Sequence, residues 1–479
     1  MGTTSARRLG ELVGDLGGER PPRYAALAGR VRRLVAEGRV PLGSRLPAER
    51  ELAAALGLSR ATVTAAYARL REDGWAVARQ GSGTFAALPA GPDRGGWVPA
   101  PADGDVLDLA HAAPLGSPLV PVAFERALAE LPRHLPGHGY HPAGLPDLRA
   151  RIAERYTARG LPTTAEEVLV TAGSLHAVSI AFQLLLRRGS RLLVEQPTYP
   201  NALQAGLAAG ARVVPAGLAP EDPAAGLAAA EEALAAVRPP VAYLMPDFQN
   251  PTGVLRGVAE RERLAAALRR AGTTAVVDET LVDLGLDATP PPPLAAFGPG
   301  HVSVGTLSKS AWGGLRIGWL RADAALVRRL TAVAVRTTLS QPVLEQLAAC
   351  AVLDELDVSL VGHRRVLRER RDVLVDELRR RLPAWSVPLP AGGLVLWCRL
   401  PSARSRALVA AAEPLGLRLA AGPLFGTGHA LDDRLRLPWS QPPDVLRRAV
   451  ELLVAADAAV GGGAPVAGPE EFRALPAGV

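Results

Sequence analysis

The chain has 479 residues and 54 basic side chains, of which one alone is a lysine, Lys309. Every other basic position holds an arginine, whose guanidinium keeps its proton near neutral pH. An amine can lose its proton and attack a carbonyl, so a solitary lysine is a candidate nucleophile. Chance retention is the alternative, and the residues around Lys309 must decide between the two.

Other side chains with useful chemistry follow short apolar runs that are typical of buried strands. Lys309 comes just after the run at 302–304. Asp278 follows the run at 275–277, and Asn250 follows the run at 241–244. Tyr199 follows the run at 191–194, and the turn Gly173-Ser174 follows the run at 168–170. Because helical patterns separate these runs, we expect an α/β domain with a mainly parallel sheet. Such sheets bind ligands at the carboxyl ends of their strands, where these groups would meet.

The chemistry of these groups suits one cofactor, pyridoxal phosphate. The amine of Lys309 would form an imine with its aldehyde, and the carboxylate of Asp278 would pair with its pyridine nitrogen. The amide of Asn250 would bond the ring oxygen, and Tyr199 would cover the ring face. Taken singly, Asp278 could be a helix cap, Asn250 a turn former and Tyr199 a packing residue. The ordered set around the only lysine is what indicates cofactor binding.

The phosphate of that cofactor needs a helix N-terminus and a guanidinium. The turn at 171–174 opens a helical segment, and Arg316 lies seven residues beyond Lys309. The further cofactor contacts that we expect are Gly173, Ser174, Leu175, Thr280, Ser308 and Arg316. We assign no metal site, because no spacing of histidines and cysteines fits one.

The segments NPTG at 250–253 and TLSK at 306–309, with the arginine at 316, resemble the markers of fold-type I aminotransferases. The resemblance implies that Lys309 is the catalytic lysine and that Arg436 binds a substrate carboxylate. Relatives usually carry a tyrosine two residues after the aspartate. This chain has Thr280 there, a shorter side chain.

Positive charge is concentrated near the N-terminus. Residues 21–88 hold eleven arginines against five acidic residues, nearly all of the net charge of +7 on the chain. Apolar residues recur at helical spacing over 24–37, 47–56 and 59–73, and strand-like segments follow at 75–79 and 84–87. The pattern predicts a helix-turn-helix with a β-hairpin wing, and its charge suits nucleic-acid binding.

This segment resembles the GntR-type winged helix through LPAERELA, LGLSRATV and RQGSGTF, which occur in that order. The resemblance implies that the third helix enters the major groove of DNA. The DNA contacts that it implies are Arg45, Arg50, Ser59, Arg60, Thr62, Thr64 and Gly81.

The two parts together resemble the MocR subfamily of transcription regulators. The expected parts are a winged helix at 20–87, a linker at 88–105, an aminotransferase-like domain at 106–457 with a small subdomain from about 340, and a disordered tail at 458–479. The resemblance implies a head-to-tail homodimer that binds a double-stranded DNA operator. Pyridoxal phosphate, or an amino-compound effector that forms an aldimine at Lys309, would modulate that binding. The alternative is an active aminotransferase with a vestigial DNA-binding module, and the intact recognition segment favours the regulator.

The composition excludes several other classes of protein. No apolar run approaches the length of a membrane span, and the charged first 21 residues are not a signal peptide. Two cysteines in so long a chain argue against a disulfide framework and fit a reducing cytoplasm. We therefore expect a cytoplasmic protein with no membrane partner.

Overall fold

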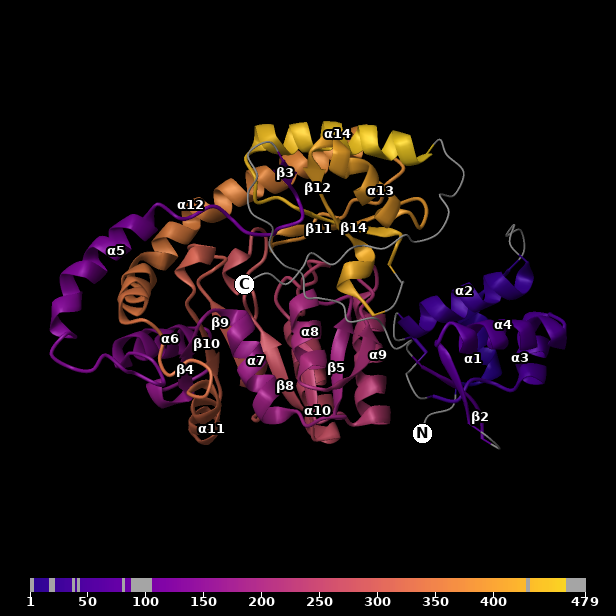
Figure 1. Ribbon diagram of the computed structural model, residues 1–479, viewed down its shortest axis with the longest axis horizontal. Coiled ribbons are helices and arrows are strands. Elements are labelled where there is room, and N and C mark those ends of the chain that lie inside the picture. The colour runs from indigo at the N-terminus through magenta and orange to yellow at the C-terminus, as the bar shows by residue number, and fades with distance from the viewer. Residues whose placement is uncertain are drawn as a thin grey trace.

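The computed structural model describes residues 4–16, 22–36, 39–40, 44–79, 82–87, 106–427 and 431–461 (Figure 1). The expected linker at 88–105 and Gly81 lie outside these ranges. A small N-terminal module lies at one end of the long axis, and helix α5 (Leu119–Glu130) lies at the other. Between them are a large domain built on a sheet and a smaller domain above it in the view. Within the described ranges, no helix is both long and apolar enough to cross a membrane.

The N-terminal module contains the expected helices and hairpin, preceded by a helix that the sequence patterns did not suggest. Its elements are α1 (Ala6–Val13), α2 (Arg23–Ala36), α3 (Glu49–Leu56), α4 (Arg60–Glu72), β1 (Ala76–Arg79) and β2 (Gly83–Ala86). The helices bury their apolar faces in one core that includes Leu27, Leu52 and Val63. Gly57, with a φ of 63°, makes the turn between α3 and α4. This arrangement is a winged helix-turn-helix.

The large domain is built on a seven-stranded sheet in the order β4-β10-β9-β8-β7-β5-β6. Its strands are β4 (Val168–Thr171), β5 (Arg191–Gln196), β6 (Arg212–Gly217), β7 (Val241–Leu244), β8 (Thr274–Asp278), β9 (Val302–Thr306) and β10 (Gly318–Arg321). Neighbouring strands are parallel except β10, which runs antiparallel to β4 and β9. The expectation of an α/β fold with a mainly parallel sheet is confirmed, although β10 was not foreseen.

Helices cover both faces of this sheet, because its strands are apolar on both sides. One face carries α7 (Ser174–Leu185), α8 (Pro200–Ala208) and α11 (Ala324–Ala334). The other carries α6 (Pro146–Ala158), α9 (Pro223–Val237), α10 (Val258–Ala271) and the first half of α12 (Val343–Arg381). Short 3₁₀ helices occupy Leu131–Arg133, Ala165–Glu167, Val282–Leu284, Leu294–Phe297, Gly313–Leu315, Glu413–Leu415 and Gly422–Phe425.

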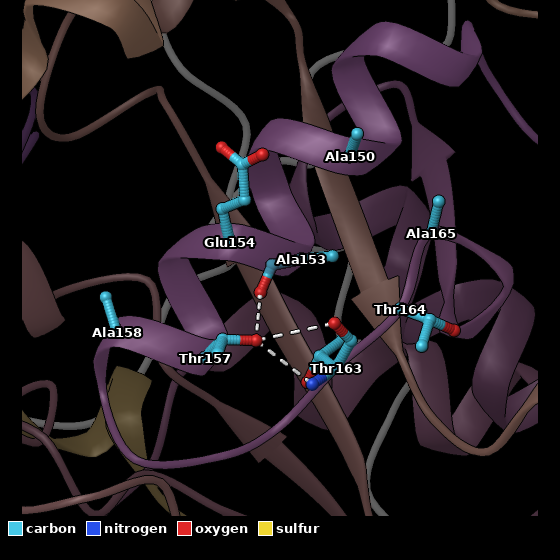
Figure 2. Close-up of a pocket in the computed structure, with 8 residues that line it drawn as sticks. All are labelled: Ala150, Ala153, Glu154, Thr157, Ala158, Thr163, Thr164 and Ala165. Atoms are coloured by element: carbon cyan, nitrogen blue, oxygen red, sulfur yellow. Dashed lines mark hydrogen bonds between the residues drawn. The ribbon is translucent and has the colours of Figure 1, made fainter.

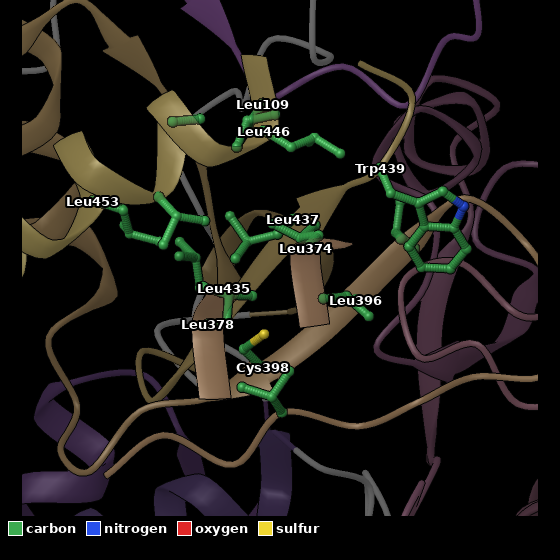
Figure 3. Packing of buried hydrophobic residues seen from close by; sticks show 14 of the residues in the cluster. Leu109, Leu374, Leu378, Leu396, Cys398, Leu435, Leu437, Trp439, Leu446 and Leu453 are labelled. Atoms are coloured by element: carbon green, nitrogen blue, oxygen red, sulfur yellow. The ribbon is translucent and has the colours of Figure 1, made fainter. Parts of the chain in front are cut away.

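The long helix α12 continues from the large domain into the small one (Figure 1). The small domain contains β3 (Leu107–Asp108), β11 (Val395–Arg399), β12 (Leu417–Arg418), β13 (Ala420–Ala421), β14 (Arg434–Pro438), α13 (Ser405–Ala412) and α14 (Pro443–Gly461). Leucines of these elements pack with Trp439 and Cys398 in one core (Figure 3).

The C-terminal boundary differs from the expected one. Helix α14 extends to Gly461, so residues 458–461 are helical and do not belong to a disordered tail. The helix persists because Leu453 and Ala456 anchor its last turns in the core of the small domain. Residues 462–479 lie outside the part of the chain that the structure describes.

Candidate functional site

The residues expected to bind a cofactor come together at the carboxyl edge of the parallel sheet. Asp278 is the last residue of β8, and Lys309 lies in the turn after β9. Asn250 follows β7, and Tyr199 follows β5 at the start of α8. Strands β7, β8 and β9 are neighbours and run parallel, so residues far apart in the sequence share one edge.

Lys309 is half-buried, and its amine donates a hydrogen bond of 2.7 Å to the carbonyl oxygen of Ala112. The pKa of this amine is lowered to about 8, mainly by burial and also by the charge of Arg436, while Asp278 opposes the shift. The neutral, nucleophilic form of the amine is therefore accessible much closer to neutral pH than it is for a free lysine.

Asp278 is buried, and each of its carboxylate oxygens accepts a hydrogen bond. The hydroxyl of Tyr243 donates to Oδ2 at 2.6 Å, and the backbone N–H of Thr280 donates to Oδ1 at 3.0 Å. Burial raises the pKa of this carboxyl, whereas hydrogen bonds from Tyr243 and from the side chain and backbone of Thr280, together with the nearby Lys309, favour its ionised form. Tyr243 did not emerge from the sequence, although it is the one polar side chain in the run at 241–244.

The expected phosphate contacts gather at the N-terminus of α7. Gly173 caps the helix with a φ of 84°, and a Cβ there would lie 2.7 Å from Nη2 of Arg316. The same Nη2 donates to the carbonyl of Ala172 at 2.8 Å. Ser174 and Leu175 form the first turn of α7. A guanidinium and a helix N-terminus therefore lie side by side, as phosphate binding requires.

Ser308 lies beside Lys309 in the turn after β9. Its backbone N–H donates to Oγ1 of Thr306 at 3.1 Å, and the two hydroxyl oxygens are 2.9 Å apart. These bonds tighten the turn that carries the lysine.

Arg436 lies on β14 of the small domain and is buried, not exposed on the strand surface. Its guanidinium lies 3.4 Å from Oδ1 of Asn250, donates to the carbonyl of Ala110, and sits 4.7 Å over the ring of Phe425. Burial lowers the pKa of Arg436 to about 10, so it still carries its charge at neutral pH. No sequence pattern indicates the carbonyls of Ala110 and Ala112, because every residue has a backbone carbonyl.

The loops that carry Tyr199 and Asn250 are joined by Gln249. Its Nε2 donates to the carbonyl of Pro197 at 2.7 Å, while its Oε1 accepts from the backbone and hydroxyl of Thr252. Tyr199 is half-buried, and burial raises the pKa of its phenol. The two loops are thus fixed relative to each other.

Four of the expected DNA contacts, Ser59, Arg60, Thr62 and Thr64, lie at the start of the recognition helix α4. The hydroxyl of Ser59 accepts from the N–H of Thr62 and caps the helix at 3.1 Å. Arg60 and Thr64 are exposed, and both reach Glu49 of α3, at 3.7 Å and 2.7 Å.

The other residues expected to contact DNA differ in burial and in position. Thr62 is half-buried, and its hydroxyl lies 2.8 Å from that of Ser59. Arg50 is exposed in the first turn of α3, and Arg45 is exposed beside the hairpin, where a Cβ on Gly83 would lie 2.9 Å from its Nε. Gly81 falls outside the described residues, so the structure does not place it.

A surface pocket lies elsewhere, along α6 (Figure 2). Its lining consists of Ala150, Ala153, Glu154, Thr157, Ala158, Thr163, Thr164 and Ala165. It includes none of the residues expected to bind a cofactor, a substrate or DNA.

Comparison with known families matches both parts of the chain. Residues 23–86 match the bacterial regulatory proteins of the gntR family, and residues 105–452 match aminotransferase class I and II. The expected resemblances are therefore confirmed.

Individual relatives match most of the chain. The chain is 25% identical over 476 residues to an uncharacterized HTH-type transcriptional regulator, YdfD, of Bacillus subtilis, covering 90% of this chain and 95% of the relative. It is 28% identical over 393 residues to a probable rhizopine catabolism regulatory protein, MocR, of Rhizobium meliloti, covering 76% and 78%. The structure of LysN, an α-aminoadipate aminotransferase from Thermus thermophilus complexed with N-(5'-phosphopyridoxyl)-L-leucine, superposes with a TM-score of 0.67. Its sequence is 29% identical, and the match covers 74% of this chain and 93% of that one.

The lowered pKa of Lys309 predicts how its reaction with an aldehyde depends on pH. A protonated amine cannot attack, so the initial rate of adduct formation with pyridoxal phosphate should rise as the pH passes through about 8, not 10.5. Borohydride trapping followed by mass spectrometry measures that rate at each pH. Nα-acetyl-lysine, which keeps a free side-chain amine, is the control under the same conditions. If the rate for the protein rose at the same pH as the rate for the control, the prediction would be contradicted.

Proposed function

The chain belongs to the class I and II aminotransferase family and, with its gntR-family domain, to the MocR-type transcription regulators, and we propose that a ligand held at Lys309 controls its binding to DNA. The observation that carries this proposal is that a half-buried amine of lowered pKa and a buried carboxylate lie at the same sheet edge. The ligand would be pyridoxal phosphate itself or an amino compound that reacts with it.

The residues at the sheet edge fit pyridoxal phosphate. Lys309 offers the amine, Asp278 an anionic partner for the ring nitrogen, and Arg316 a cation beside the N-terminus of α7. Because Gly173 has no Cβ, its backbone can lie close to the guanidinium of Arg316. When bound, the cofactor supplies an aldehyde that condenses with amines.

An effector would meet two further groups. Arg436 is a buried cation that a carboxylate can engage with two hydrogen bonds, and Asn250 lies next to it. Tyr199 lies on a loop that Gln249 holds against the Asn250 loop. We therefore propose that the effector is an amino compound with a carboxylate, bound between Lys309 and Arg436.

The segment after the linker provides a route from this site to the DNA-binding module. Strand β3 pairs with β12, and Asp108 accepts hydrogen bonds from the N–H groups of Ala110 and His111 at 2.7 and 3.1 Å. The carbonyls of Ala110 and Ala112 accept from Arg436 and Lys309. A ligand that engages those two cations competes with the segment for the same donors, and its binding would change how the linker is anchored.

Exposed apolar side chains support the proposed homodimer. They lie on α5, on the middle of α12 and on nearby loops: Leu115, Val122, Leu128, Leu135, Tyr140, Trp312, Leu339, Val358 and Val361. In Figure 1, α5 lies at the end of the molecule opposite the N-terminal module. A second copy of the chain covering this face would bury it and leave both recognition helices free.

The gntR-family domain also supports the expected cytoplasmic location.

An active aminotransferase remains a second candidate, because the amine, the carboxylate and the arginine proposed to bind a substrate carboxylate all lie at one site. Thr280 lacks the phenol that relatives carry at this position, and it contributes its backbone N–H to Asp278. Steady turnover of an amino acid and keto acid pair, without binding to any DNA sequence selected from a random pool, would favour the enzyme over the regulator.

The central test is the covalent adduct at Lys309. The wild-type protein with pyridoxal phosphate should show an imine absorption band and, after borohydride reduction, carry the cofactor on Lys309 by mass spectrometry. Lys309→Arg keeps the charge but has no reactive amine, so it should form no adduct and its DNA affinity should not respond to pyridoxal phosphate. A reducible adduct in Lys309→Arg would show that another group is the nucleophile.

A second test concerns the recognition helix. Arg60→Ala should weaken binding to a selected operator by about 1–3 kcal/mol, because a base or phosphate contact is lost. Titration of labelled operator at several salt concentrations measures this, with cofactor binding unchanged. Arg69→Ala is the matched control, since Arg69 lies in the last turn of α4 and pairs with Asp73 at 3.1 Å. Equal effects of the two substitutions would remove Arg60 from the specific interface.

A third test addresses the route to the linker. Asp108→Ala should loosen the 107–112 segment, so that pyridoxal phosphate still forms its adduct but changes operator affinity by a factor near one. The ratio of operator dissociation constants with and without pyridoxal phosphate is the measurement. Asp433→Ala, which removes a surface partner of Arg399 in the same domain, is the control. A wild-type ratio in Asp108→Ala would show that the signal takes another route.

A further inference from the structure

Tyr243 is a buried tyrosine to which neither the sequence patterns nor the family resemblance assigns a role. It lies on β7, is fully buried, and donates its hydroxyl to Oδ2 of Asp278 at 2.6 Å. This is a short bond to an acid in the candidate cofactor site. Its length and burial call for an explanation beyond packing.

The register of the sheet explains how the contact is made. Tyr243 pairs with Val276 on β8, and Asp278 is two residues further along the same strand. Residues two apart on a strand point to the same face and are roughly 6.6 Å apart. A tyrosine is long enough to span that step and bring its hydroxyl to the carboxylate, whereas phenylalanine would end short of it.

The two donors to Asp278 approach different oxygens. Thr280 uses its backbone N–H on Oδ1, and Tyr243 uses its phenol on Oδ2. The two oxygens of a carboxylate together have about four lone-pair sites, so these donors leave room for a further hydrogen bond. The carboxylate is therefore fixed in orientation but still able to accept an N–H from a bound ring.

The phenol is suited to remain a donor. Burial and the charge of Asp278 raise the pKa of Tyr243 well above its ordinary value, so it keeps its proton at any physiological pH. Asp278 lies among apolar strand residues, where an ionised carboxylate is costly without hydrogen bonds. The hydroxyl of Tyr243 offsets part of that cost.

The ring of Tyr243 also contacts α7, the helix whose N-terminus is expected to bind the phosphate. It packs edge-to-face against Phe182 of α7, with ring centroids 6.2 Å apart and an interplanar angle of 74°. The N-terminus of the same helix holds Gly173 and Ser174. One side chain therefore links the carboxylate expected at the ring nitrogen to the helix expected at the phosphate.

We propose that Tyr243 is a positioning residue, which holds the carboxylate of Asp278 ionised and aimed at the ring nitrogen of pyridoxal phosphate. The proposal rests on the proposed function, because it requires that the cofactor binds at Lys309. Tyr243 acts through Asp278 and does not itself contact the reacting atoms. Its effect should appear in cofactor affinity and in the spectrum of the bound cofactor.

Tyr243→Phe is the test, because it removes the hydroxyl and retains the ring that packs against Phe182. The dissociation constant for pyridoxal phosphate should rise about tenfold, as expected when a buried charged group loses a hydrogen bond. The imine band at fixed pH should also change in position or intensity, because protonation of the ring nitrogen is less favoured. Operator binding measured on the cofactor-free protein should change little.

Two further variants make the result specific. In an Asp278→Asn background, adding Tyr243→Phe should have a much smaller effect on affinity and spectrum, because the carboxylate charge that the phenol stabilises is already absent. Tyr67→Phe is the matched control, since it removes another buried hydroxyl, which donates to the carbonyl of Pro47 at 3.0 Å in the N-terminal module. It should leave cofactor binding unchanged.

The outcomes separate this role from the proposed function. A wild-type protein without an imine band overturns both. A normal wild-type band with unchanged affinity and spectrum in Tyr243→Phe overturns the role of Tyr243 alone. An undiminished effect of Tyr243→Phe in the Asp278→Asn background overturns the route through the carboxylate.

Discussion

The burial of positive charge at the carboxyl edge of the sheet is the constraint around which the large and small domains are arranged. Lys309 and Arg436 come from different domains, and burial lowers the pKa values of both side chains. The fold offsets the cost with the carboxylate of Asp278 near Lys309, with that of Asp108 near Arg436, and with backbone carbonyls of the segment at 110–112. The amine is the group that can give up its proton, so the burial that costs stability also makes it a nucleophile.

Buried ion pairs hold the loops that deliver the remaining groups. Arg256 pairs with Glu195 at 3.2 Å, and Arg261 pairs with Asp247 at 2.6 Å, with all four side chains almost completely buried. Such pairs contribute little net stability compared with apolar packing, but breaking one leaves an uncompensated charge. They therefore restrict the loops after β5 and β7 to one arrangement, which is what a rigid ligand requires.

The segment at 107–112 contacts both the large and the small domain and follows the linker from the DNA-binding module. The segment is anchored on the small domain through β3 and Asp108, and it is contacted by a cation from each domain. Because it follows the linker directly, the proposed competition for those cations would act where the DNA-binding module is attached. In the proposed function, the charge excess of the N-terminal module supplies affinity for DNA and the sheet edge supplies the signal.

The sequence by itself determined the two modules, the strand and helix order of the parallel sheet and most of the candidate site, because strand-end positions and the solitary Lys309 are visible as local patterns. It did not reveal α1, β10 or the helical residues 458–461, whose stability comes from packing against distant segments. Only the tertiary structure decided that Tyr243 reaches Asp278 and that the carbonyls of Ala110 and Ala112 face the two cations. These contacts depend on strand register and on backbone groups, and neither is encoded by residue type at a fixed spacing.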